Sequence, residues 1–87
     1  MKVYKEYLHI HPNTPIYTSL QGKLLTIEKQ GISLVAYFDA DTEYYHKYII
    51  YCLETGAEAN IEGAEYFKTL MLADGDYVLH IFIKEVE

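Results

Sequence analysis

The histidines and the single cysteine are the side chains of this chain whose types could support metal binding or catalysis. His9 and His11 are two residues apart, so on a strand they share one face, where paired histidines can hold a metal ion. Pro12 ends that strand, however, and no cysteine or acidic residue at a matching spacing completes a ligand set. We therefore expect no metal site, and an exposed histidine pair on an edge strand.

The other chemically capable residues lie in apolar runs or in turns. His46 and His80 fall within strand-like runs, where a packed or hydrogen-bonded histidine is the ordinary case, and Cys52 lies in the most apolar run, where a thiol is usually buried. The alternating carboxylates of residues 39–43 lack the glycine and the terminal glutamate of a calcium loop. No phosphate-binding loop or serine nucleophile motif is present. The sequence thus predicts no enzyme active site and no cofactor.

The charge of the chain argues against a nucleic-acid partner. Thirteen acidic residues against seven lysines give a net charge of −6, and the chain has no arginine. Nucleic-acid binding ordinarily requires a basic patch, and arginine supplies the planar fork that grips phosphates and guanine edges. The apolar runs are far shorter than the ~20 residues that span a bilayer, and one cysteine cannot form an internal disulfide. We expect a cytoplasmic protein that binds neither nucleic acid nor membrane.

Short β-prone runs separated by polar turns must position these residues. Strand-like segments lie at 1–10, 16–20, 23–29, 32–38, 44–53, 64–72 and 77–83. Periodicity leaves 64–72 open to helix or strand, and its aromatic residues together with the following Asp74-Gly75-Asp76 turn favour strand. A helical turn within 57–66 is the expected exception. About six or seven strands predict one all-β or β-rich α+β domain over residues 1–87, either a small antiparallel sandwich or a partly closed barrel.

The ten tyrosines predict self-association. Tyr44, Tyr45, Tyr48 and Tyr51 crowd one segment, and alternate strand positions point to opposite faces, so both faces of this strand carry rings. A chain of this size cannot bury both faces of every strand alone, and tyrosine is enriched at interfaces. We expect a homodimer or larger homo-oligomer, with Tyr37, Tyr44 and Tyr45 as candidate interface residues. The alternative, that the tyrosines only cover a small core, remains open.

Six runs of the sequence follow one another in a distinctive order: "KVYKEYLHI", "IYTSLQGKLLTIEKQ", "LVAYFDAD", the strand into "ETG", "EYFKTLML" and "GDYVLHIFIKE". This order resembles a family of small phage and prophage proteins of unknown function, over nearly the whole chain. In that family one strand runs into a Gly-Thr-Gly loop followed by His-Pro. Glu54 here stands in place of the first glycine, and Ala57 in place of the histidine. The recurrent family positions fall on Lys23, Leu25, Asp39, Thr55, Gly56, Tyr66, Thr69, Gly75 and His80.

The resemblance implies a phage or prophage accessory protein that acts inside a bacterial cell, and it brings no activity with it. The missing catalytic groups and the surplus of aromatic residues predict a non-enzymatic, oligomeric binding protein. Its partner would be a host protein or a small signal such as a nucleotide, captured to counter host defence. The backbone amides of the Thr-Gly turn could face an anion. The candidate ligand-binding residues are Lys47, Tyr48, Tyr51, Thr55, Gly56, Lys68 and His80. The alternative function is a virion or assembly component whose strand edges pair with other subunits.

Overall fold

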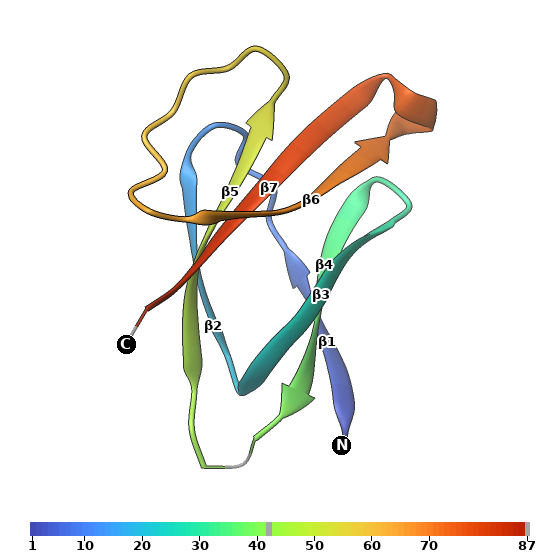
Figure 1. Cartoon of the computed structure of the whole chain (residues 1–87). Helices are drawn as coiled ribbons and strands as arrows, with labels where there is room; N and C mark the ends of the chain where they lie inside the picture. The colour runs from blue at the N-terminus through green and yellow to red at the C-terminus, as the bar shows by residue number, and fades with distance from the viewer. Residues whose placement is uncertain (42, 87) are drawn as a thin grey trace.

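Two antiparallel sheets packed face to face make up the computed structural model, which describes residues 1–41 and 43–86 (Figure 1). The three-stranded sheet has the order β1-β4-β3, and the four-stranded sheet has the order β2-β5-β7-β6. The predicted all-β antiparallel sandwich is confirmed, and the sheets do not close into a barrel. The elements are β1 (Val3–Leu8), β2 (Pro15–Leu20), β3 (Gly22–Gln30), β4 (Ser33–Ala40), β5 (His46–Glu54), β6 (Glu65–Leu72), the 3₁₀ turn η1 (Ala73–Gly75) and β7 (Tyr77–Val86).

Two local predictions are wrong. The described residues of 57–66 contain no helical turn; the short 3₁₀ turn lies at Ala73–Gly75, between β6 and β7. Ile32 was expected to begin the strand over 32–38, but it lies in the turn between β3 and β4 with its side chain 82% exposed. Gln30 pairs directly with Ser33, which leaves Gly31 and Ile32 as a two-residue turn. Such turns require a positive φ at their first position, and Gly31 supplies it with φ 62°.

The core lies between the sheets and takes alternate side chains from the central strands. Burying one aliphatic side chain of this size stabilises the fold by roughly 1.5–3 kcal/mol. Tyr48 adds a buried ring whose hydroxyl accepts a hydrogen bond of 2.9 Å from the backbone N–H of Leu24 in the other sheet. A register shift between Leu24 and Thr26 interrupts the pairing of β3 with β4 at this point. The side chains without exposed surface in this cluster are Ile27, Leu34, Ala36, Ile50, Cys52, Leu79 and Ile81.

The strand order explains the long connection after β5. Both β5 and β6 pair antiparallel with β7, so they run parallel to each other, and the chain must pass over β7 between them. Glu54 lies opposite Leu79 and Glu65 lies opposite Ile83, so the connection must also run back along β7. Figure 1 shows residues 55–64, the crossover segment, turning back across the four-stranded sheet. The need to cross a strand, rather than a binding function, therefore accounts for its length.

The crossover segment covers part of the outer face of the four-stranded sheet. Tyr51 alternates with the core residues Ile50 and Cys52, so its ring points outward, yet it is only 4% exposed. Burial raises the pKa of the Tyr51 hydroxyl, and the charge of Glu62 in the crossover segment raises it further. Lys84 of β7 also donates a hydrogen bond of 3.1 Å to the Glu62 carbonyl. The outward tyrosine of β5 is thus buried within the chain itself.

The two flanks of the sandwich differ. On one flank, Lys68 of β6 forms an ion pair with Glu28 of β3 and donates a hydrogen bond of 2.8 Å to Thr26 Oγ1. On the other flank, β1 and β2 are the edge strands of the two sheets, and hollows remain between them. One flank is therefore bridged by an ion pair and the other is open.

Gly22 marks a close approach of β3 to β4. A Cβ atom added at Gly22 would lie 2.1 Å from the Asp39 carbonyl oxygen. Overpacking of this kind typically costs 1–3 kcal/mol, so we expect Gly22→Ala to lower the free energy of unfolding, measured in urea, by about 3 kcal/mol. The control Gly31→Ala meets no atom within 4 Å and should lose only about 1 kcal/mol from its positive φ. Equal losses of unfolding free energy in the two variants would contradict the close approach of Gly22 to Asp39.

The flank ion pair predicts a pH dependence. Hydrogen bonds from Lys68 and Thr26 hold the pKa of Glu28 below its ordinary value of 4.5. A carboxylate with a lowered folded pKa contributes stability that is present above the unfolded pKa and is lost as the pH falls through the folded pKa. Because Glu28 is 45% exposed, we expect Glu28→Gln to lower the free energy of unfolding at pH 7 by less than ~1 kcal/mol. This difference should vanish on titration well below pH 4.5.

In a Lys68→Met background Glu28→Gln should have little effect at any pH, and a full effect there would contradict the pairing.

Candidate functional site

A chain of hydrogen bonds joins the turn after β5 to β7 and β6. Thr55 Oγ1 lies 2.8 Å from His80 Nε2, and Thr69 Oγ1 lies 3.0 Å from His80 Nδ1. The Tyr66 hydroxyl lies 2.8 Å from Thr69 Oγ1. We call these four residues the histidine chain. They meet because His80 stands opposite Thr69 in the sheet and opposite Leu53, just before the turn that carries Thr55.

The turn itself depends on Gly56. The Ala57 N–H donates to the Glu54 carbonyl at 3.0 Å, and Gly56 adopts φ 86°, a conformation that residues with a side chain rarely take. The predicted reversal of the chain at Thr55-Gly56 is confirmed. The same turn directs the Thr55 hydroxyl back onto β7, so the histidine chain fixes the start of the crossover segment.

The histidine chain orders the start of the crossover segment through side-chain hydrogen bonds. A neutral imidazole has one donor and one acceptor nitrogen, so one threonine donates a proton to the ring and the other accepts one. A hydroxyl nucleophile would also need a substrate cavity and donors for a developing oxyanion. None of the hollows described below is lined by His80. The geometry is that of a structural anchor.

Glu54, at the end of β5, forms a second anchor. Asn13 Nδ2 donates to Glu54 Oε1 at 2.8 Å, and the Glu54 N–H donates to Asn13 Oδ1 at 3.0 Å. The Asn13 N–H also donates to the Cys52 carbonyl at 2.9 Å. Asn13 lies in the connection between β1 and β2, so the pair fastens that connection to the end of β5. Glu54 therefore has a structural role in this chain.

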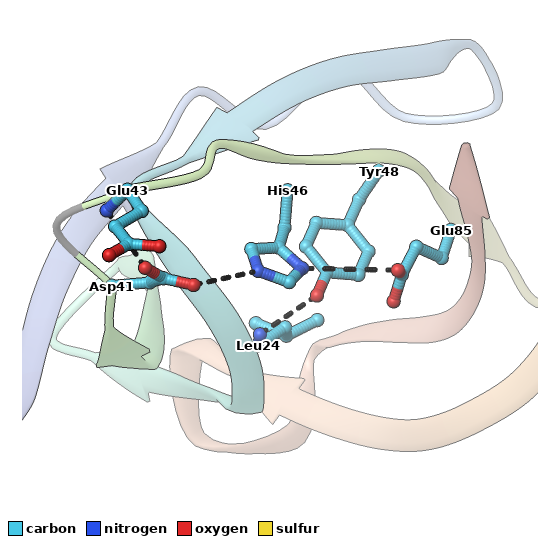
Figure 2. Close-up of polar contacts among 6 residues, drawn as sticks. All are labelled: Leu24, Asp41, Glu43, His46, Tyr48 and Glu85. Carbon is cyan, nitrogen blue, oxygen red and sulfur yellow. Dashed lines mark hydrogen bonds and ion pairs between the residues drawn. The ribbon is translucent and has the colours of Figure 1, made fainter. Parts of the chain in front are cut away.

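A second histidine lies at the opposite end of β5, between two carboxylates (Figure 2). His46 Nε2 is 3.7 Å from Asp41 Oδ2, and His46 Nδ1 is 3.9 Å from Glu85 Oε2. Asp41 also accepts a hydrogen bond of 2.9 Å from the Glu43 N–H, which is the main cause of the lowered pKa of Asp41. Among the described residues no group of three or more histidine, cysteine or acidic side chains is suited to a metal ion. Through its contacts with Asp41 and Glu85, His46 links the β4–β5 connection to β7.

The open flank contains two adjoining hollows of about 420 and 430 Å³. Both are lined by Glu6 of β1 and Ser19 of β2, so they adjoin at these residues along the edge strands, and we call the two hollows together the flank groove. Four tyrosine rings line it, and each is more than half exposed. The first hollow contains Lys2, Tyr4, Glu6, Ser19, Gln21, Phe38, Ala40, Asp41 and Tyr45, and the second contains Glu6, Tyr7, Leu8, His9, His11, Pro15, Ile16, Tyr17, Thr18 and Ser19.

The structure brings together only part of the predicted ligand-binding set. Thr55 and His80 meet in the histidine chain, and Gly56 shapes the turn that carries Thr55. Tyr48 is buried between the sheets, Tyr51 is buried at the outer face, and the Lys68 ammonium is bound to Glu28. Lys47 lies at the other end of β5 and lines an apolar hollow that Tyr48 also lines, so these two candidates share one place. The candidate residues thus divide among four places.

The candidate interface residues also separate. Tyr45 is 63% exposed and lines the flank groove, whereas the neighbouring Tyr44 is 65% exposed outside its lining. Tyr37 is half-buried in β4. Sequence reasoning missed the edge-strand tyrosines Tyr4 and Tyr7 of β1 and Tyr17 of β2. The sequence did offer one signal for Tyr4 and Tyr7. Both rings lie on the first strand, and no sequence pattern placed this strand in the middle of a sheet.

Comparison with known proteins identifies a family but no function. The chain belongs to the family described as Domain of unknown function (DUF7352), whose model matches residues 1–87. Neither the curated proteins nor the solved structures contain a match to the chain. Within the part of the chain that the structure describes, no helix is long and apolar enough to cross a membrane. The function must therefore be argued from the geometry.

The anchoring role of the histidine chain predicts a local change in dynamics. Thr55→Val removes one net hydrogen bond, worth about 1 kcal/mol, and should speed amide hydrogen exchange in residues 55–64 while leaving the core of β5 unchanged. Thr55→Ser retains the hydroxyl and should exchange like the wild type. If both variants changed exchange equally, the hydroxyl–imidazole bond would not be the anchor.

Proposed function

We propose that this member of the DUF7352 family is a non-enzymatic binding protein whose flank groove receives an extended segment of a partner protein. The observation that carries the proposal is that two hollows follow each other along β1 and β2 and share the lining residues Glu6 and Ser19. A row of partly open hollows along two strands can receive an extended chain, whereas an enclosed cavity suits a small molecule.

The composition of the groove supports a protein partner. Tyr4, Tyr7, Tyr17 and Tyr45 present broad apolar faces together with hydroxyl groups. Tyrosine rings are enriched in protein interfaces because one end packs and the other finds a hydrogen-bond partner. Four rings that are each more than half exposed on one flank are typical of an interaction surface.

The electrostatics disfavour the nucleotide alternative. The first hollow carries Glu6 and Asp41 against the single ammonium group of Lys2, and the chain has no arginine to grip a phosphate. At the Thr55-Gly56 turn, the Ala57 amide already donates to the Glu54 carbonyl. The turn therefore has one amide fewer to offer an anion.

The proposed setting rests on the resemblance to phage and prophage proteins. In that setting the partner is a host protein, bound in the bacterial cytoplasm to counter host defence. The second candidate is a virion or assembly component. It is favoured by one feature, the exposed edge strand β1, five of whose six residues are exposed.

A displayed library of random peptides, panned on the purified protein, tests the groove. We expect selected peptides whose affinity falls about tenfold or more in Tyr17→Ala, because truncating an anchor ring commonly costs over ~1 kcal/mol. Tyr44→Ala removes a ring that is 65% exposed outside the groove lining and should leave affinity unchanged. Peptides that bind both variants as well as the wild type, or a library that yields no binder, would overturn the proposal.

A further inference from the structure

Three of the four edge strands carry features that hinder pairing with another chain. β2 begins at Pro15, which has no N–H to donate. β3 has a register shift between Leu24 and Thr26, and β6 has one between Tyr66 and Lys68. Prolines and bulges are the usual means by which proteins protect sheet edges. These three edges are therefore poor templates for strand addition.

The fourth edge strand, β1, is unprotected. It pairs with β4 in unbroken register from Val3↔Asp39 to Leu8↔Leu34 and contains no proline. The Lys2 carbonyl accepts a hydrogen bond of 2.8 Å from the Ala40 N–H. Because hydrogen-bonding direction alternates along a strand, the backbone groups of odd-numbered residues in β1 point away from β4. A regular edge of this kind is a ready template for another strand.

We propose that two copies of this chain pair antiparallel through β1, about a two-fold axis at Tyr4. A two-fold axis normal to the sheet leaves each side chain on the same face of the sheet. Residues opposite each other across the new pair must therefore both have odd numbers or both have even numbers. Centring on Lys5 or Glu6 would set identical charges directly opposite each other, which is destabilising. Centring on Val3 would set Tyr4 opposite Lys2. Centring on Tyr7 would set Glu6 opposite Leu8 and Lys5 opposite His9. Neither register places a carboxylate opposite an ammonium group.

The register centred on Tyr4 is complementary. Lys2 of each copy lies opposite Glu6 of the other, and the two Tyr4 rings lie opposite each other. Val3 lies opposite Lys5, and these are odd-numbered residues whose backbone groups face the new strand. Opposite charges and aromatic pairs across strands each contribute roughly 0.2–1 kcal/mol. The charge pattern of the strand itself therefore selects a second copy as the occupant.

Pairing in this register would also extend the flank groove. Lys2, Tyr4 and Glu6 line its first hollow, together with Tyr45. The first hollows of the two copies would then adjoin at the two-fold axis, while the second hollows, beyond Tyr7, would remain at the outer ends. The dimer rests on the β1 edge alone, so it can hold even if no peptide binds the groove.

Charge reversal tests the register by sedimentation velocity over a concentration series. Lys2→Glu and Glu6→Lys each place like charges opposite one another twice per dimer, and each should raise the dimer dissociation constant about tenfold. The double variant again sets opposite charges facing each other, with their signs exchanged between positions 2 and 6. Its dimer dissociation constant should return close to the wild-type value. Wild-type protein that remains monomeric, or a double variant as weak as the singles, would overturn the proposal, as would assembly that grows beyond a dimer.

Disulfide trapping tests the axis independently. In this register Tyr4 forms a non-hydrogen-bonded pair, with Cα atoms about 4.5 Å apart, within the range that a disulfide spans. Tyr4→Cys should give a covalent dimer on oxidation. Tyr7→Cys, at a similarly exposed position, should not. The native Cys52 will not interfere because it is buried, and its burial raises its thiol pKa to about 11. Cross-linking through position 7 in place of position 4 would refute the register.

Discussion

Backbone hydrogen bonding at the sheet edges is the constraint on which the rest of this structure depends. Two open sheets have four edge strands, and every unpaired N–H and C=O group there must meet water, another segment or another chain. The chain meets this constraint differently on its two flanks. The β3–β6 flank is bridged by the Lys68–Glu28 ion pair and interrupted by bulges, whereas the β1–β2 flank is open and lined by tyrosines. Both proposals follow from this asymmetry.

The histidines illustrate how polar groups are accommodated in so small a fold. Both ring nitrogens of His80 lie within hydrogen-bonding distance of threonine hydroxyls, and His46 lies between two carboxylates. Within the described residues, no buried side-chain nitrogen or oxygen lacks a hydrogen-bond partner. Groups that could have been reactive in isolation are thus committed to holding turns and connections in place. The surface left for function is the one that the chain itself does not cover.

Local patterns predicted the strands well because alternation and turn residues act over a few positions. The segments 23–29, 32–38, 44–53 and 77–83 correspond to β3, β4, β5 and β7. The ambiguous segment 64–72 became a strand because β7 offers it a pairing partner. Ile32 was assigned to the strand because it begins an apolar run and follows Gly31, which made Gln30-Gly31 the expected turn. The actual turn is Gly31-Ile32, one residue later. The crossing of residues 55–64 could not be predicted, since strand order is a non-local property.

The candidate site was less predictable for the same reason. Thr55 and His80 are far apart in sequence, and only the family resemblance placed them together in one set. Lys68 was a candidate ligand because it carries charge near the loop in sequence, yet its ammonium is bound to Glu28 of the other sheet. The edge-strand tyrosines could be seen in the sequence, but their exposure depends on the absence of a neighbouring strand.

Residue-resolved amide hydrogen exchange of β1 across a protein dilution series tests the central claim most directly. Amides of Tyr4, Glu6 and Leu8 face β4 and should stay protected at every concentration, so they provide an internal control. Amides of Val3, Lys5 and Tyr7 should be protected at high concentration and exchange freely on dilution, as the second β1 strand departs. Rapid exchange of these three amides at all concentrations would contradict the account, because it would show that the open edge remains bound to water alone.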